Sequence, residues 1–571
     1  MNVYRFVLAT ITIALMSAAG LTQAASVVDS KHNLSISGPG PIKSSTESRI
    51  CIFCHTPHNA RRDIPYLWNR DDSTVNYSTY ISSTMHATIG QPTGASKMCL
   101  SCHDGSIALG KLVTRTSVIP FENGVSVMPD GLSKLGSDIS DDHPVSFLYD
   151  SGLAVSNGEL VDPASLPQEI SLDKNGMLQC TSCHDPHDDA FGKFLVLNNT
   201  ASALCIGCHD RTDWAASSHA TSVAIWNGVA PDPWPRSSAT QVNQNACKNC
   251  HQPHTAGGHV RLLNYAIEEL NCFTCHTGNV ATKDIERQTT KFYSHGVHLY
   301  LGAHDAAEDF TTSVQTHVEC VDCHNPHRTN SSTTTATASA PNVPSSMLGV
   351  KGINAAGNPL GESAYLYEVC FKCHADNNVV TSAAITRQTQ QLNTRLEFDI
   401  ANPSFHPVEA AGKNPDVPSL IPSPDYDRFS VIYCTDCHSS DDGPATGGVE
   451  AGGPHGSINP FILEENYTTA DNTLESPTEY AMCYKCHDRN SIRNDESFSE
   501  HKKHVFKKDA PCSACHDPHG SQVNTHLINF DRSIVSPNKD GILQFQDQGK
   551  FRGSCWLSCH GKDHKDKDYK P

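Results

Sequence analysis

Hydrophobic residues form one long run in this chain, and it lies at the beginning. Arg5 precedes an apolar stretch from Phe6 to Ala19, and small residues around Ala24 follow it. A positive residue, a short apolar run and a small-residue end are typical of a secretory signal peptide, so we predict residues 1–24 as the cleaved signal peptide of an exported protein. No later stretch approaches the roughly 18 apolar residues of a membrane helix, and we expect no transmembrane span.

Beyond residue 24 the apolar positions are short and scattered. The intervals between them are rich in Ser, Thr, Gly, Pro and Asn, which favour turns and loops. Hydrophobic residues make up 38% of the chain, below the usual range of about 45–50%, so the side chains alone make a poor core. We predict an irregular fold with little secondary structure, in which short helices and loops wrap around non-protein hydrophobic material.

The cysteines explain this composition. All 24 cysteines fall into twelve pairs, and each pair is followed directly by histidine. Eleven motifs read C-x-x-C-H, and the last has one more residue between its cysteines. The paired cysteines are Cys51 and Cys54, Cys99 and Cys102, Cys180 and Cys183, Cys205 and Cys208, Cys247 and Cys250, Cys272 and Cys275, Cys320 and Cys323, Cys370 and Cys373, Cys434 and Cys437, Cys483 and Cys486, Cys512 and Cys515, and Cys555 and Cys559. The histidines that follow are His55, His103, His184, His209, His251, His276, His324, His374, His438, His487, His516 and His560.

C-x-x-C-H is the attachment motif of c-type haem. The two thiols form thioethers with the haem vinyl groups, and the adjacent imidazole is held beneath the iron as the proximal ligand. A disulfide scaffold or a zinc ribbon does not require that histidine, and a thioredoxin-type redox pair does not recur twelve times. Because only 32 of the 571 residues are histidine, chance does not explain the pattern. We predict about twelve covalent haems c, whose faces supply the missing apolar material.

The motifs form six doublets, and this repeat organises the chain. In five doublets the first motif runs on directly into x-Pro-His, and in the fifth doublet the same element follows at His455, after an insertion. The second motif of each doublet lacks this continuation. We divide the mature chain into doublets at residues 25–117, 118–213, 214–285, 286–390, 391–492 and 493–571.

Each doublet also has a histidine upstream of its first motif. Six upstream and six x-Pro-His histidines equal the number of distal ligands that twelve bis-histidine irons require. The distal candidates are His32, His58, His143, His187, His219, His254, His298, His327, His406, His455, His504 and His519. In the fourth doublet His295, His304 and His317 are alternatives to His298, and in the sixth His501 is an alternative to His504. The remaining histidines, His564 among them, are spares.

Methionine competes poorly for the distal position. Eight methionines occur in the chain, and two of them lie in residues 1–24, so the mature chain has half the number needed. Since methionine ligation raises the haem potential, bis-histidine ligation implies low potentials throughout.

The last motif departs from the pattern. Its extra residue must bulge for both sulfurs to reach the vinyl groups, a modest backbone strain. We expect Cys555, Cys559 and His560 to carry a haem at one end of the haem chain. A degenerate site and a disulfide are the alternatives.

Charge restricts the partners. The formal charge of −19 argues against a nucleic-acid partner. It favours a basic redox partner or a cationic or mineral oxidant, or it only keeps an exported protein soluble.

The strings at residues 51–58, 99–105, 180–187 and 512–520 resemble those of multihaem c-type cytochromes with doubled C-x-x-C-H motifs, found in dissimilatory metal-reducing bacteria. The resemblance implies electron transfer along a haem chain, in the periplasm or at the outer cell surface of a Gram-negative bacterium. It implies other redox proteins as partners, in a complex with an outer-membrane porin or in self-assembled filaments, and a terminal acceptor such as a metal oxide. A multihaem reductase with one open iron is the alternative, and a periplasmic electron store is a third possibility.

Overall fold

The computed structural model describes residues 26–61, 66–305, 317–330, 339–376, 383–421 and 426–570. The predicted signal peptide therefore lies outside the described residues. The chain divides into two compact units, and each is described by itself. The first comprises residues 1–211 and 251–262, and the second comprises residues 212–250 and 263–571.

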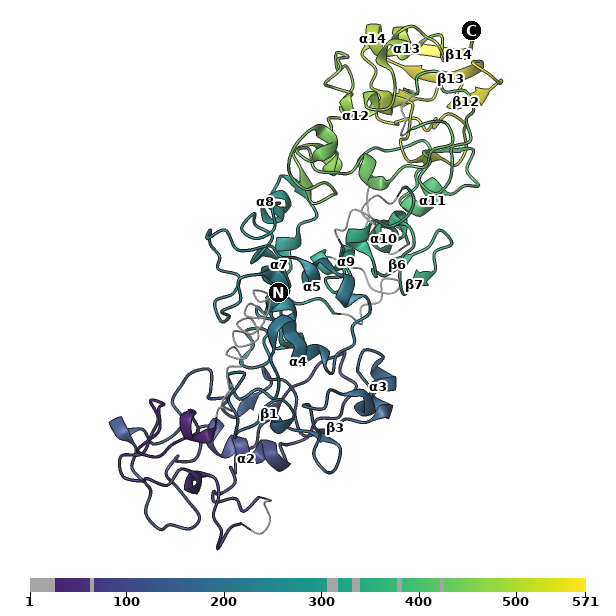
Figure 1. Cartoon of the computed structure of the whole chain (residues 1–571). Coiled ribbons are helices and arrows are strands. Elements are labelled where there is room, and N and C mark those ends of the chain that lie inside the picture. Colours follow the sequence, from purple (N-terminus) through teal and green to yellow (C-terminus); the bar gives the residue numbers. More distant parts are fainter. Residues whose placement is uncertain are drawn as a thin grey trace, which may run out of the picture. The chain divides into compact units, whose positions relative to one another are not determined.

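The first unit contains short elements joined by turns (Figure 1). Its helices are α2 (Gly94–His103), α3 (Ser151–Asn157) and α4 (Ala203–Ile206). Its strands are β1 (Ser78–Thr79), β2 (Asp138–Ile139), β3 (Phe147–Leu148) and β4 (Met177–Leu178). The strands β1 and β2 pair in parallel, and β3 and β4 pair antiparallel.

The second unit has the same irregular character, apart from one larger sheet. Its helices are α5 (Ser218–Thr221), α6 (Val242–Asn245), α7 (Glu268–Phe273), α8 (Ile285–Thr289), α9 (Cys320–Cys323), α10 (Leu366–His374), α11 (Thr394–Phe398), α12 (Ala481–Tyr484), α13 (Arg489–Arg493) and α14 (His501–Lys508). Its strands are β5 (Tyr293–Ser294), β6 (Gly352–Ile353), β7 (Pro359–Leu360), β8 (Ser404–Phe405), β9 (Gly456–Ser457), β10 (Gly520–Ser521), β11 (Val535–Ser536), β12 (Gln544–Asp547), β13 (Gly553–Cys559) and β14 (Lys562–Tyr569). The prediction of short helices with little regular structure is confirmed.

A helical turn carries the first cysteine of every C-x-x-C-H motif. The first motifs of five doublets begin in 3₁₀ turns at Cys51–Phe53, Cys180–Ser182, Ala246–Asn249, Cys434–Asp436 and Cys512–Ala514, and that of the fourth doublet begins in α9. The second motifs begin in α2, α4, α7, α10 and α12. Five of the six first motifs thus begin in a 3₁₀ turn, whereas the second motifs of the first five doublets begin in α-helices. The two kinds of motif thus differ in backbone as well as in sequence.

The last motif is an exception, since its two cysteines lie in strand β13. This strand pairs antiparallel with β12 and β11 along one edge and with β14 along the other. This motif is therefore an extended segment, unlike the eleven motifs that begin in helical turns. Successive side chains of a strand point to opposite faces, so Cys555, Leu557 and Cys559, at every second position, lie on one face of β13.

Apolar side chains gather in several small clusters beside the cysteines. One cluster in the first unit joins Phe53, Leu109 and Ile119 and packs against Cys54 and Cys102. In the second unit one cluster around Phe371 packs against Cys434, and another around Phe530 packs against Cys515 and both cysteines of β13. The buried apolar surface is thus arranged around the attachment motifs.

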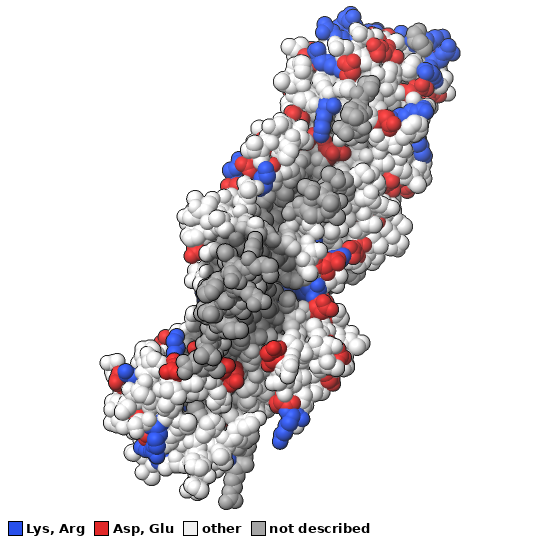
Figure 2. Space-filling model, in the orientation of Figure 1, with Lys and Arg blue, Asp and Glu red and all other residues white. Residues whose placement is uncertain are grey.

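Two surface properties bear on partners. Of the helices in the described part of the chain, none is long and apolar enough to cross a bilayer. On the face in Figure 2, Lys and Arg gather at the C-terminal end of the second unit, over the elements labelled α14 and β14 in Figure 1. Exposed Lys502, Lys507 and Lys508 of α14 and Lys562 and Lys567 of β14 contribute to this basic end.

Candidate haem-binding sites

No disulfide joins any of the 24 cysteines, all of which lie in the described residues, and within each unit the sulfur atoms of consecutive motifs are neighbours. Inside the doublets the second cysteines approach one another, as Cys54 does with Cys102 and Cys437 does with Cys486. Between doublets the sulfur atoms of the first cysteines lie within contact distance. These pairs are Cys99 with Cys180, Cys272 with Cys320, Cys370 with Cys434, and Cys483 with Cys512. Sites that are consecutive in sequence are therefore adjacent in space.

The motif histidines are oriented by their second nitrogen. Nδ1 lies 2.7–2.9 Å from a backbone carbonyl oxygen in seven of them, namely His55, His103, His184, His251, His324, His438 and His516. A carbonyl only accepts, so Nδ1 carries the proton and Nε2 keeps a free lone pair for a metal. Burial lowers the pKa of His209 to about 3 and that of His276 to about 4. These imidazoles are neutral at pH 7, which is the form that binds a metal.

A second histidine ring faces nine of the twelve motif histidines. The ring centres lie 6.0–6.4 Å apart in the pairs His55 with His187, His103 with His32, His184 with His254, His209 with His143, His276 with His219, His324 with His455, His374 with His295, His438 with His519, and His516 with His501. Two imidazoles that bind one metal ion, each through a nitrogen at about 2 Å, have ring centres about 6 Å apart. The observed spacing therefore fits a bis-histidine haem iron.

The pairs follow the repeat. In the first four doublets an upstream histidine faces the second motif of its own doublet, as His32 faces His103 and His219 faces His276, whereas in the sixth doublet His501 faces the first motif, at His516. An x-Pro-His histidine faces the first motif of the preceding doublet, as His187 faces His55. The rings of the upstream histidines also point Nδ1 at the proline carbonyl of the next x-Pro-His element. Such contacts join His32 to Pro186, His219 to Pro326, His295 to Pro454 and His406 to Pro518. These contacts connect the first doublet to the second, and the third, fourth and fifth doublets each to the next one.

Two further sets of candidates make contacts other than the ring pairs above. Burial lowers the pKa of His487 to about 4, and His406 adds to this effect. His406 therefore lies close to His487. His251 belongs to the first unit and His327 to the second. His327 contacts Trp214 at 6.2 Å between ring centres. His251 and His327 remain ligands predicted from the sequence.

Three distal candidates lie elsewhere than the repeat predicts. His58 is exposed and is in none of the described ring pairs, because no doublet precedes its own. His298 stacks on Phe273 and contacts the Thr289 hydroxyl at 2.7 Å, whereas His295 faces His374. In the sixth doublet His501 faces His516, and His504 faces His564 at 6.2 Å.

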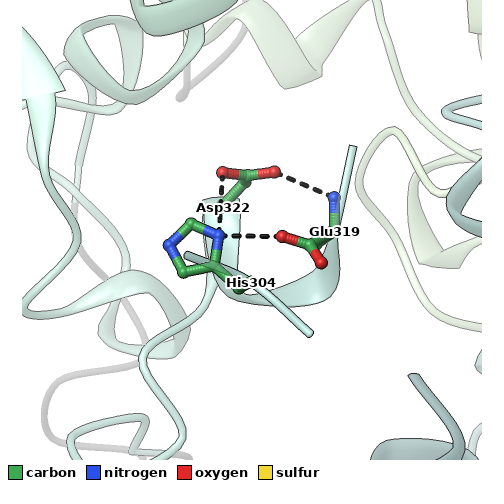
Figure 3. Close-up of side chains that lie close together, drawn as sticks. All are labelled: His304, Glu319 and Asp322. Carbon is green, nitrogen blue, oxygen red and sulfur yellow. Dashed lines mark hydrogen bonds and ion pairs between the residues drawn. The ribbon is translucent and has the colours of Figure 1, made fainter. Parts of the chain in front are cut away.

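The side chain of His304 contacts two carboxylates, those of Glu319 and Asp322 (Figure 3). Its Nδ1 lies 2.8 Å from Glu319 Oε2 and 4.0 Å from Asp322 Oδ1. The backbone N–H of Glu319 donates to Asp322 at the start of α9. Burial acts to lower the pKa of His304, but the two carboxylates outweigh it and the pKa is raised. This ion pair holds the His304 ring beside the start of α9.

The proximal histidine of the last motif is placed differently from all the others described. His560 Nε2, the nitrogen that other motif histidines keep free, lies 2.8 and 3.0 Å from the carboxylate oxygens of Asp471. The spare histidine His564 instead pairs with His504. In the sequence, the one sign of a strand at this motif is the spacing of Cys555, Leu557 and Cys559 at every second residue, because successive side chains of a strand point to opposite faces.

Comparison with known proteins adds two similarities. The family described as "Doubled CXXCH motif" matches residues 174–213 and 429–491, which contain both motifs of the second and of the fifth doublet. The tetraheme c-type cytochrome CymA of Shewanella oneidensis is 30% identical over 101 residues, which are 18% of this chain and 50% of that protein. The chain thus spans about half the length of this curated relative. The paired C-x-x-C-H motifs and these similarities together support the conclusion that the chain is a multihaem c-type cytochrome.

Proposed function

We propose that the chain is an exported electron carrier with twelve covalent haems, each between two histidines. The observation that carries this proposal is the spacing of 6.0–6.4 Å between the centres of nine pairs of histidine rings. Haem iron takes up and releases one electron at a time. The histidines fill both axial positions, so they leave no place for a substrate on these irons.

The order of the sites supports transfer along the chain. Thiols of consecutive motifs are in contact within each unit, so neighbouring haem edges are held close together. Short distances between cofactors favour electron hopping, and the protein supplies their spacing and burial. Electrons then move through each unit in sequence order, from doublet to doublet.

The partners are other redox proteins and, at the far end of the path, a metal or another terminal acceptor outside the inner membrane. The resemblance to cytochromes of metal-reducing bacteria suggests a porin complex or a filament as the assembly. The predicted signal peptide and the C-x-x-C-H motifs favour the periplasm or the outer cell surface.

Mass and spectra of the purified secreted protein test this function. We expect an intact mass equal to the chain without residues 1–24 plus twelve haems, and a ferric spectrum of low-spin haem without a methionine-to-iron band. Ten or fewer haems would contradict the doublet scheme. A stoichiometric high-spin haem that turns over a substrate would instead support a multihaem reductase.

A further inference from the structure

One of the ten described histidine pairs contains no motif histidine. The ring centres of His504 and His564 lie 6.2 Å apart, within the range of the nine pairs that include a motif histidine. His504 donates its Nδ1 hydrogen to the carbonyl of Glu500 at 2.8 Å, so its Nε2 is free. The pair has the spacing of an axial ligand pair.

The β-hairpin places His564 beside the cysteines of the last motif. Cys555, Leu557 and Cys559 lie on one face of β13, and His564 in β14 is the register partner of Leu557. Register partners in an antiparallel pair have their side chains on the same face. Phe545 pairs with Cys555 and Val535 pairs with Cys559, so this face also carries the buried cluster around Phe530. His564 and both thiols therefore share one apolar face.

The same hairpin makes His560 a turn residue. His560 and Gly561 are the two residues between β13 and β14, and their φ angles are 48° and 71°. Two positive φ angles are characteristic of the two-residue type I′ turn. In this turn the Nε2 atom of His560, through which it would bind iron, lies 2.8 Å from a carboxylate oxygen of Asp471.

Helix α14 brings the distal ring to this site and to the preceding one. His501 and His504 are three residues apart and lie on the same side of the helix. His501 faces His516 of the eleventh motif, and His504 faces His564. Cys515, Cys555 and Cys559 all pack against the cluster around Phe530, so the eleventh and twelfth sites are adjacent. The last site continues the row even though its motif is irregular.

We propose that the haem on Cys555 and Cys559 is held between His504 and His564, and that His560 is a turn residue rather than a ligand. The attachment motif of this haem is then C-x-x-x-C-x-x-x-x-H. This inference rests on the proposed function, since it concerns one of the twelve haems, and it changes the predicted proximal ligand from His560 to His564.

Two single variants separate the candidate ligands. His560→Asn removes the imidazole and keeps the turn, because asparagine adopts positive φ readily. We expect it to retain twelve haems, all low spin, with unchanged potentials. His564→Ala should leave one haem with an open position, seen as one high-spin ferric haem that binds one equivalent of cyanide. The reverse result, a high-spin haem in His560→Asn and none in His564→Ala, would overturn the proposal.

A third variant decides the case in which His560→Asn fails to receive its haem. His564→Met leaves both cysteines and His560 in place, so attachment is not affected. We expect one methionine-to-iron charge-transfer band and one haem of raised potential. Absence of that band in a protein with twelve haems would overturn the assignment of His564.

The double variant Cys555→Ala, Cys559→Ala distinguishes this inference from the proposed function. We expect its mass to fall by one haem. An unchanged mass together with eleven haems in the unmodified protein would show that the site is never occupied. The inference on His564 would then fail, and the bis-histidine scheme for the other haems would stand.

Discussion

His519 Nδ1 donates a hydrogen bond to Glu397 Oε2 at 2.8 Å, whereas most of the other paired histidines with a described Nδ1 contact bond a backbone carbonyl. A carboxylate acceptor makes the imidazole a stronger donor to iron, and this stabilises the ferric state. We therefore predict that Glu397→Gln raises the potential of the haem between His438 and His519 by tens of millivolts, on the order of 1 kcal/mol. Potentiometric titration followed by EPR of the individual haems measures the shift.

Two controls make this test specific. Asp142→Asn should act in the same way on the haem between His184 and His254, because His254 Nδ1 lies 3.0 Å from Asp142 Oδ1. Asp130→Asn removes an exposed carboxylate that pairs with Lys134, so no potential should move. Equal shifts in all three variants would indicate a general charge effect and no role for the hydrogen bond.

The x-Pro-His histidines allow a matched test of distal ligation. His187 faces His55, whereas His58 stands in the same sequence context and is exposed. We predict that His187→Met keeps twelve haems attached and raises one potential by on the order of 0.1 V, because thioether ligation favours ferrous iron. His58→Met should leave every potential unchanged. If His187→Met shifts no potential, the ring pair at 6.1 Å is not a ligand pair.

The sequence predicts the chemistry of the sites better than their partners. Cysteine spacing and the following histidine define the attachment sites locally, and short helical turns form at eleven of them. The choice among His295, His298, His304 and His317 depends on contacts between doublets, which no local pattern records. His295 is favoured because its ring faces His374 and its Nδ1 reaches the carbonyl of Pro454 in the next doublet.

The last motif could not be assigned from spacing alone. An extra residue between the cysteines suggests a bulged helical turn, but three neighbouring strands select the extended conformation instead. The hairpin places His560 in the turn and brings His564 into register with Leu557. Long-range strand pairing therefore determines which histidine is available, and a local reading of the motif misses it.

Acid stability of the first unit should depend on Glu47. Its carboxylate is buried and binds Arg49 at 2.9 Å and Arg115 at 2.6 Å, and the hydrogen bond from Arg49 contributes most to lowering the pKa of Glu47 to about 2. A carboxyl group with a lowered folded pKa stabilises the fold above its unfolded pKa, and this stability is lost as the pH falls toward 2. We predict that Glu47→Gln costs on the order of 1 kcal/mol at pH 7, discounted for the exposed arginines.

The pH dependence distinguishes this role of Glu47 from simple packing. The difference in free energy of unfolding between Glu47→Gln and the unmodified protein should shrink as the pH falls from 5 to 2. In this interval the carboxylate takes up a proton, because its pKa is about 4.5 in the unfolded chain and about 2 in the folded protein. Denaturant unfolding followed by near-UV circular dichroism measures it. A difference that stays constant over this interval would show that the ion pairs contribute nothing.

The basic surface near the last haem predicts how electrons leave the chain. Exposed Lys502, Lys507 and Lys508 lie on α14, the helix that carries His504. Although the whole chain has a formal charge of −19, these lysines make the local potential positive and attract an anionic acceptor. We predict that changing all three to Glu slows oxidation of the reduced protein by an anionic iron complex about tenfold at low salt and speeds oxidation by a cationic cobalt complex.

Both effects should fade at high ionic strength, and Lys111→Glu in the first unit should change neither rate. Unchanged rates in the triple variant would mean that electrons leave from another haem.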